Sequence, residues 1–279
     1  MEEKKLALIL WDFSKSCDIA LQHAIQLATA GENDIMLLHI IPQSGLLSAL
    51  LSPNKNTAEI SKANKRFNAV VEDVRQKYAI NPRTMVLEGN PTKILRKLVE
   101  TANVNLVISH HTYTYKGKKH RVTSWTKKLI FKDITLPIVI VNQAPAHSHY
   151  MEIAIPIYQD HSFKESVQWI INLARYYHCN VNFIKPYILE ELKKKQLASN
   201  IYFTKKMLDS VGIVYGMKTA KKGNVFEDEV FRFADNIEAD LIMVMSDKHE
   251  KLVSPERERN LHIPVMCVNT RIKKYQPFN

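Results

Sequence analysis

The residues best suited to chemistry lie in one stretch, residues 108–125, which reads ISHHTYTYKGKKHRVTSW. It holds three histidines, two tyrosines, one glycine and four lysine or arginine residues, and it has no acid. Such a stretch suits an anion, because lysine and arginine side chains bind phosphate and tyrosines among cations stack on nucleic-acid bases. A solvated loop can have the same composition, so three interpretations are open at this point.

The histidines and cysteines do not predict a metal site or a disulfide. His110 and His111 are adjacent at the end of an apolar run, so their side chains point to opposite sides of a strand. Cys17, Cys179 and Cys267 are far apart and odd in number, which fits neither a disulfide framework nor a CxxC metal motif. The sequence also lacks a nucleophile elbow, a Walker loop and an HExxH motif. We therefore expect no metal and no enzymatic activity, with a weak ATPase left open.

Composition and charge set the class of protein but not its ligand. The chain has 279 residues, 46% of them hydrophobic and 24% charged, and a formal net charge of +11. This length suits two domains of roughly 140 residues each, and the positive charge favours anionic partners in general. No run approaches the ~18–20 apolar residues of a membrane span, and the N-terminus MEEKKLALILWDFSKS is a poor secretory signal. We expect a cytoplasmic protein without a membrane partner.

An internal repeat gives the organisation of the chain. Segments that begin at Lys4 and His149 each contain an apolar run, a polar turn with serine and a long helical stretch. The order continues in both copies: DIMLLHII matches NVNFIKPY, basic helices follow at about 56–79 and 188–211, and LPIVIVN matches IPVMCVN at the end. Strands that alternate with helices predict parallel sheets with right-handed crossovers.

The expected fold is therefore α/β, with two tandem open parallel-sheet domains of five strands each. The domains are predicted at residues 1–143 and 151–279, joined by a linker at 144–150. The 108–125 stretch then follows the fourth strand of the first domain, at a carboxyl strand end where open sheets place ligand-binding loops. The second copy is eight residues shorter here, and its loop, SDKHEKLVSPERERN, has no glycine.

Three motifs in this order resemble the universal stress protein family in its tandem two-domain form. WDFSKS is similar to the family's Asp-Gly-Ser turn, GNPTKILRKLVETANVNLVIS to its Gly-x-Pro turn, helix and strand, and LPIVIVN and IPVMCVN to its closing strand. The resemblance covers nearly the whole chain and implies a flavodoxin-like or adenine-nucleotide-hydrolase-like fold that dimerises through its last strands. Some members bind ATP through a Gly-x2-Gly-x9-Gly-Ser/Thr loop after the fourth strand, where backbone N–H groups approach phosphate.

The first domain keeps little of that glycine loop. Gly117 is its one remaining glycine, and Ser124 and Trp125 stand where Gly-Ser or Gly-Thr would be. Asp12 keeps the family's acid after the first strand, whereas Ile157 stands at about that place in the second domain. The resemblance assigns the following residues to a nucleotide: Asp12, Ser14, Gly117, Lys118, Thr123 and Ser124. Asp12 has a second interpretation as a cap of the following helix, bonding to N–H groups just past Ser14.

The closing strands predict pairing between the two domains. Each strand is apolar on both faces, as a buried strand is, and as the last strand of its sheet it has an edge that proteins tend to cover. The pairing would make an internal pseudo-dimer, while a homodimer and an unknown protein partner are left open. The residues expected to pair are Ile138, Val139, Ile140 and Val141 with Val265, Met266, Cys267 and Val268.

The sequence favours a non-catalytic universal-stress-type protein with a stress-linked regulatory or binding role and degenerate nucleotide loops in both domains. The basic stretch is then a solvated loop, with an ATP site ranked second and a nucleic-acid surface third, since no nucleic-acid-binding module is visible. One alternative is an ATP-binding switch or weak ATPase that uses the first domain only. Another is a carrier of a small apolar or anionic ligand. No cofactor is expected apart from ATP under the first alternative.

Overall fold

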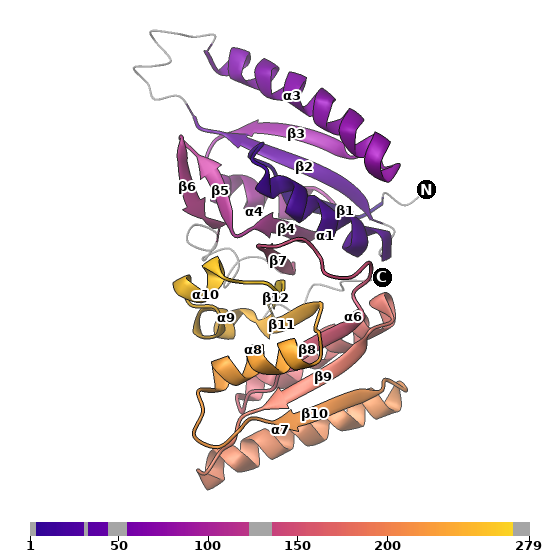
Figure 1. The fold of residues 1–279 in the computed structure, drawn as a ribbon, viewed down its shortest axis with the longest axis vertical. Helices are drawn as coiled ribbons and strands as arrows, with labels where there is room; N and C mark the ends of the chain where they lie inside the picture. The colour runs from indigo at the N-terminus through magenta and orange to yellow at the C-terminus, as the bar shows by residue number, and fades with distance from the viewer. Residues whose placement is uncertain (1–3, 31–32, 44–54, 123–135, 270–279) are drawn as a thin grey trace. The chain divides into compact units, whose positions relative to one another are not determined.

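Contacts within the chain divide it into two compact units, Met1–Leu129 and Ile130–Asn279. Each unit is a sheet flanked by helices, so the α/β class predicted from the sequence is confirmed (Figure 1). The computed structural model describes residues 4–30, 33–43, 55–122 and 136–269.

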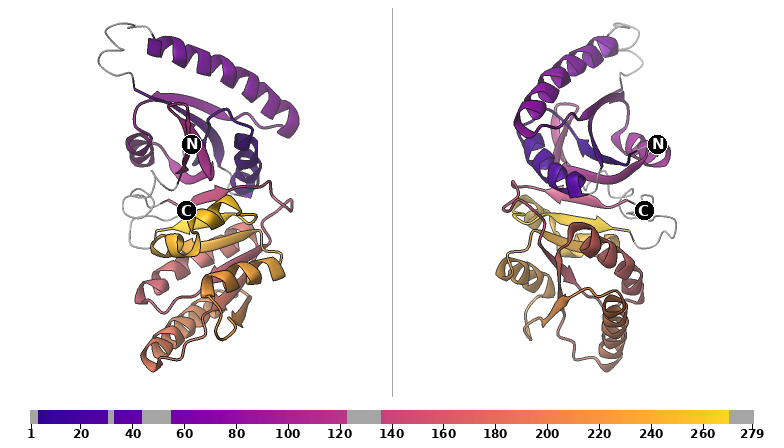
Figure 2. Two further views of the ribbon diagram at one scale, coloured as in Figure 1. Left: turned by 60° about the vertical axis from the view of Figure 1, so that its left-hand side comes forward. Right: turned by 90° about the vertical axis from the view of Figure 1, so that its right-hand side faces the viewer.

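The main sheet of the first unit is parallel. Its elements are β1 (Leu6–Leu10), α1 (Ser16–Ala30), β2 (Asp34–Ile41), α3 (Lys55–Tyr78), β3 (Arg83–Glu88), α4 (Pro91–Thr101) and β4 (Val104–His110). The strand order is β4-β1-β2-β3, and both β1 and β4 are buried along their whole length, as in a sheet covered on two faces. Helices α1 and α3 lie on one face and α4 on the other (Figure 2), as right-handed crossovers require when the chain returns from β3 to β4.

The GNP motif starts α4 as the sequence predicts. Gly89 has a φ of 139°, a conformation that few other residues adopt. Asn90 caps the helix, since its side-chain oxygen accepts the N–H of Lys93 at 3.2 Å. Pro91 takes the first helical position, where a missing N–H costs no hydrogen bond.

The basic stretch after β4 is a β-hairpin instead of the irregular loop that we expected, although residues 116–119 are exposed. Its strands are β5 (Thr112–Tyr115) and β6 (Lys118–Arg121), which pair antiparallel. Lys116 and Gly117 connect them with φ angles of 51° and 70°, the signature of a two-residue type I′ turn. The alternation TYTY on one side of Lys-Gly directs Tyr113 inward, and its side chain is buried.

The second unit repeats the pattern of the first. Its strand order is β10-β9-β8-β11-β12-β7, parallel except where β7 meets β12. The strands are β7 (Ile138–Val141), β8 (Glu152–Pro156), β9 (Asn180–Lys185), β10 (Tyr215–Thr219), β11 (Leu241–Met245) and β12 (Val265–Val268). The helices are a 3-10 turn at His161–Ser166, α6 (Val167–Tyr177), α7 (Glu191–Ser210), α8 (Phe226–Asn236), α9 (Ser246–Leu252) and α10 (Pro255–Arg259).

Strand β7 belongs to the first repeat by sequence and to the second unit by contacts. It pairs antiparallel with β12, with Ile140 opposite Val265 and Val139 opposite Met266. The contact boundary therefore precedes β7, whereas the repeat places the boundary after it. All residues of both strands are buried, which fits their continuous apolar sequences.

Replacing Val139 with proline should destabilise the second unit. Val139 is fully buried in the β7–β12 ladder, and proline has no N–H to donate within a ladder. A buried backbone group left unpaired costs about 1–3 kcal/mol in free energy of unfolding, beyond the side-chain change. Chemical denaturation of Val139→Pro, with Val139→Ala as the variant that keeps the N–H, measures the difference. Equal stabilities for the two variants would contradict the importance of this ladder.

Candidate functional site

The end of β1 is held to the hairpin by Asp12. One carboxylate oxygen of Asp12 accepts the N–H of Ser14 at 2.9 Å, and the other accepts the N–H of Thr114 at 2.7 Å. The first of these bonds closes a turn within the WDFS segment, instead of reaching the N–H groups beyond Ser14 that a helix cap would use. The second ties β1 to β5 across 102 positions of sequence. Asp12 therefore joins two strand ends.

Cys17 completes the hydrogen bonding of this carboxylate. Its thiol donates to Asp12 at 3.1 Å, and its sulfur accepts the N–H of Asp12 at 3.3 Å. Burial and the neighbouring Asp12 raise the pKa of Cys17 to about 12, so it remains a thiol and keeps donating. The pKa of Asp12 is lowered despite its burial, because hydrogen bonds from Ser14, Cys17 and Thr114 favour the carboxylate. The charged form of Asp12 is therefore the one that the fold stabilises.

Tyr113 fills the space at the ends of β1 and β2. Only 1% of this residue is exposed. Its hydroxyl oxygen accepts the N–H of Ile40 at 2.9 Å, and the hydroxyl faces the carbonyl of Trp11 at 3.4 Å. Backbone groups that a ligand could otherwise bind at these strand ends are therefore bonded to the protein's own side chain.

The hairpin thus closes the crevice that this topology creates. Strand order reverses between β1 and β4, and in open α/β sheets ligands bind at the carboxyl ends of strands at such a reversal. Asp12 follows β1, Thr114 follows β4, and the hydrogen bond between them crosses this point. Tyr115 adds a third attachment, since its hydroxyl donates to the carbonyl of Gly89 after β3 at 2.8 Å.

The structure brings together some of the residues that the sequence assigned to a nucleotide and separates others. Asp12 and Ser14 lie at the end of β1 and bond to each other. Gly117 and Lys118 lie at the turn of the hairpin, and a Cβ added at Gly117 would meet no atom within 4 Å. Thr123 and Ser124 lie outside the described residues.

Sequence reasoning missed Tyr113, Cys17 and His39 as parts of this site. A signal for Tyr113 was available, because TYTY-KG-KKHR is an alternating pattern around a two-residue turn and is typical of a hairpin. Nothing near Cys17 or His39 indicates their contacts, which depend on how β1, β2 and β4 come together.

A pocket of about 270 Å³ remains beside the hairpin, between β2, α3 and β5. Aromatic and apolar side chains form part of its wall, among them Phe13 and Tyr115. Three cations also line it: Lys62 and Arg66 from α3, and Lys116 from the turn of the hairpin. The guanidinium of Arg66 lies 4.0 Å from the centre of the Phe13 ring, a cation–π distance. Phe13 has a φ of 61°, which turns its side chain out of the strand end.

His39 faces the same pocket as a neutral ring. Its Nδ1 lies 2.7 Å from the carbonyl oxygen of Trp11, and because a carbonyl only accepts, Nδ1 carries the proton. Burial lowers the pKa of His39, and the nearby Arg66 lowers it further. Neutral His39 then has Nε2 as its hydrogen-bond acceptor.

In the second unit Tyr158, and not Ile157, stands where Asp12 stands in the first. The N–H of Trp11 bonds to Leu38 at 2.8 Å, and the N–H of Ile157 bonds to Ile184 at 2.9 Å at the matching place in β8 and β9. The residue after Ile157 therefore corresponds to the residue after Trp11. The position expected from the sequence is therefore one residue out, and neither Ile157 nor Tyr158 is an acid.

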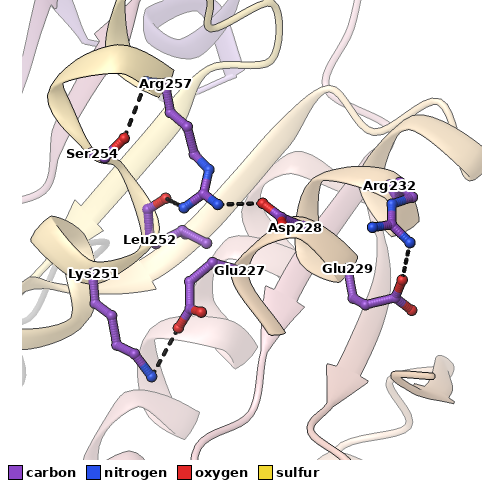
Figure 3. Close-up of polar contacts among 8 residues, drawn as sticks. All are labelled: Glu227, Asp228, Glu229, Arg232, Lys251, Leu252, Ser254 and Arg257. Atoms are coloured by element: carbon purple, nitrogen blue, oxygen red, sulfur yellow. Dashed lines mark hydrogen bonds and ion pairs between the residues drawn. The ribbon is translucent and has the colours of Figure 1, made fainter. Parts of the chain in front are cut away.

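The glycine-free loop of the second unit forms two short helices, α9 and α10, which ion pairs attach to α8. Figure 3 shows Arg257 paired with Asp228, and Lys251 paired with Glu227 at 2.9 Å. Arg257 also donates to the carbonyl of Leu252 at 3.2 Å. At the strand ends of this unit, Lys248 contacts Asp160 at 3.0 Å. The cations of these three contacts, Lys248, Lys251 and Arg257, are each matched by a carboxylate.

Within the described residues neither a metal-binding cluster nor a membrane-spanning helix occurs. Among these residues no three side chains of His, Cys, Asp or Glu come together in a way that could hold a metal ion. None of the helices in the described part of the chain combines the length and the apolar character of a membrane span.

A protein-family model matches the first repeat of the chain. Residues 6–140 match the model of the Universal stress protein family. This part of the chain belongs to that family.

Solved structures extend the fold of universal stress proteins to the whole chain. One from Archaeoglobus fulgidus DSM 4304 is 14% identical, aligns over 95% of this chain and 98% of its own, and has a TM-score of 0.67. Another, assigned to the same family in Pseudomonas aeruginosa UCBPP-PA14, is 13% identical over 95% and 92%, with a TM-score of 0.58. A universal stress protein from Archaeoglobus fulgidus in complex with dAMP is 15% identical and aligns over 43% of this chain and 98% of its own, with a TM-score of 0.34. No curated protein gives a significant match.

The two units depart in different ways from the glycine loop that the family resemblance implies. In the first unit the segment after the fourth strand is a hairpin whose tyrosines are bonded to the ends of three other strands. In the second unit the corresponding segment is helical and carries acids and bases paired with α8. In neither segment do the described residues form a row of glycines with N–H groups free for a phosphate.

Proposed function

We propose that this chain is a non-catalytic universal-stress-type protein with a regulatory or binding role, in which neither unit uses a nucleotide. The observation that carries the proposal is the hydrogen bond between Tyr113 and the N–H of Ile40, with Asp12 bonded to Thr114 beside it. These contacts fill the crevice at the ends of β1, β2 and β4. A nucleotide would have to displace a buried tyrosine and break a charge-assisted hydrogen bond.

The second unit supports the proposal through its charges. Lys248 and Lys251 are already paired with Asp160 and Glu227, so a triphosphate entering here would meet carboxylates and occupied lysines. Tyr158 replaces the aspartate of the first unit. We propose that the second unit acts as a structural or protein-binding partner of the first, in keeping with the cytoplasmic location and protein partner expected from the sequence.

The alternative function is an ATP-binding switch or weak ATPase that uses the first unit only. It requires the hairpin to open, because the residues that would approach the nucleotide are bonded to each other when it is closed. The net charge of +11 favours anions in general and does not choose between the two functions.

Thermal unfolding of the full chain with and without millimolar Mg-ATP tests the proposal. We expect no change in the unfolding temperature, because ligands stabilise a native state only when they bind to it. A bound nucleotide at ~100 times its dissociation constant would add about 2.7 kcal/mol, which such a scan detects. A shift of that size in the wild type that disappears in Lys118→Gln would contradict the proposal and favour the ATP switch. Lys65→Gln, an exposed charge on α3, serves as the control for loss of one positive charge.

A further inference from the structure

The cations of the pocket beside the hairpin lack carboxylate partners. Lys62, Arg66 and Lys116 line this pocket, and none of them forms an ion pair within the part of the chain that the structure describes. Glu59 is the only acid among the described lining residues. In the second unit Lys193, Lys248 and Lys251 are each paired with a carboxylate. The pocket of the first unit therefore has an excess of positive charge and suits an anion.

Arg66 and His39 are held in place before any ligand arrives. The guanidinium of Arg66 lies 4.0 Å from the centre of the Phe13 ring, and this cation–π contact restrains the side chain while its N–H groups can still meet an anion. The Phe13 and His39 rings meet edge to face, with centres 4.8 Å apart. The hydrogen bond between His39 Nδ1 and the carbonyl of Trp11 holds the ring against which Phe13 packs. Preorganised groups lose less entropy on binding than free surface side chains.

The rest of the wall is apolar. Ile41 and Pro42 follow the end of β2, Ala63 is buried on α3, and Tyr115 comes from the hairpin. At about 270 Å³ the pocket lies just below the ~300–1,000 Å³ of pockets for drug-sized ligands. Its occupant should therefore be smaller than those ligands, with an apolar body and one charged end.

We propose that this pocket binds a compact aromatic carboxylate, with Arg66 contacting the carboxylate, Lys62 and Lys116 adding charge at the rim, and Phe13 and Tyr115 contacting the ring. A planar carboxylate matches the two-pronged edge of a guanidinium. The inference rests on the proposed function, in which the hairpin fills the nucleotide crevice and this pocket is open beside it. It names the ligand class that such a binding protein would take.

Isothermal titration of the full chain with benzoate, benzamide and benzamidine tests the ligand class, because the three probes share a ring and differ in charge. Benzoate should bind, benzamide should bind at least about tenfold more weakly, and benzamidine should not bind. Added salt should weaken the binding of benzoate, since the cations are exposed. Equal binding of benzoate and benzamide, or no binding of benzoate at millimolar concentration, would overturn the inference.

Glutamine variants of three cations on α3 test where benzoate binds. Arg66→Gln should weaken benzoate binding about tenfold or more, and Lys62→Gln should weaken it by less. Lys65→Gln removes the same charge three positions from Lys62 and outside the pocket, so it should leave binding unchanged. Equal effects of Lys62→Gln and Lys65→Gln on benzoate binding, or unchanged binding in Arg66→Gln, would overturn the assignment of the site.

A competition with Mg-ATP separates failure of the inference from failure of the proposed function. If benzoate does not bind and Mg-ATP leaves the unfolding temperature unchanged, the carboxylate site is wrong and the proposed function stands. If Mg-ATP displaces benzoate, both the ligand class and the proposed function are wrong.

Discussion

Replacing Tyr113 with alanine should lower the free energy of unfolding by about 3–5 kcal/mol, the range for truncating a large buried aromatic side chain. Replacing it with phenylalanine should cost about 1–3 kcal/mol, because the N–H of Ile40 is left buried without its partner. Chemical denaturation of the two variants, fitted separately for each unit, measures both effects. Tyr113 is the residue that holds the hairpin in the strand-end crevice, so these are the largest losses that we expect in the first unit.

Tyr158 provides the matched control in the second unit. It is as buried as Tyr113, but its hydroxyl has no hydrogen-bond partner among the described residues. Burial raises its pKa far above the usual range, with nearby Glu227 adding to the effect. Tyr158→Phe removes an unsatisfied polar group and should leave stability unchanged or slightly higher. If Tyr113→Phe were as mild as Tyr158→Phe, the hydroxyl of Tyr113 would not be holding the hairpin.

Replacing Asp12 with asparagine should lower the free energy of unfolding by about 1.5–3 kcal/mol at neutral pH, the range for hydrogen bonds to a charged group. The lower part of this range applies because Asp12 is partly exposed and water screens its charge. Asparagine keeps the shape of the side chain, but only one of its terminal atoms accepts, while Asp12 accepts at both oxygens. The bond to Ser14 or the bond to Thr114 is therefore lost.

The pH dependence of the stability of Asp12→Asn tests whether the charge of Asp12 causes the loss. The hydrogen bonds lower the pKa of Asp12 in the folded state, so its contribution is present above the unfolded value of ~3.9 and is lost as pH falls through the folded value. Denaturation of wild type and Asp12→Asn at about pH 7 and about pH 3 compares the two regimes. The stability difference should be largest at neutral pH and shrink in acid. A difference that stays constant with pH would mean that the charge of Asp12 is not involved.

The sequence predicts the fold better than the site because the two depend on different kinds of contact. The repeat, the parallel sheets and the acid after β1 follow from local patterns such as LALIL, GNPTK and the strand-helix alternation. The bond from Tyr113 to Ile40 joins residues 73 positions apart and exists only once β2 and β5 meet. The sequence places Ile157 instead of Tyr158 at the position of Asp12 for a similar reason. Hydrogen-bond register, and not residue type, decides which position corresponds to Asp12.

The basic stretch shows how composition alone can mislead. Its lysines, arginine and single glycine suit a solvated loop or a phosphate loop equally well. The alternation of Thr and Tyr before Lys116 and Gly117 favours a hairpin instead, and once it forms, the inward tyrosine needs a buried place. The crevice at the ends of β1, β2 and β4 supplies that place. A segment that looks like a degraded ligand loop therefore contributes the side chain of Tyr113 to the first unit's core.

Amide hydrogen exchange at Ile40 and Thr114, with and without millimolar Mg-ATP, tests the central claim most directly. These two N–H groups donate to Tyr113 and Asp12, so their exchange rates report whether the hairpin fills the crevice. The account predicts strong protection at both positions and no change on adding Mg-ATP. Rapid exchange of both amides in the free protein, or a change in their exchange when Mg-ATP is added, would contradict it.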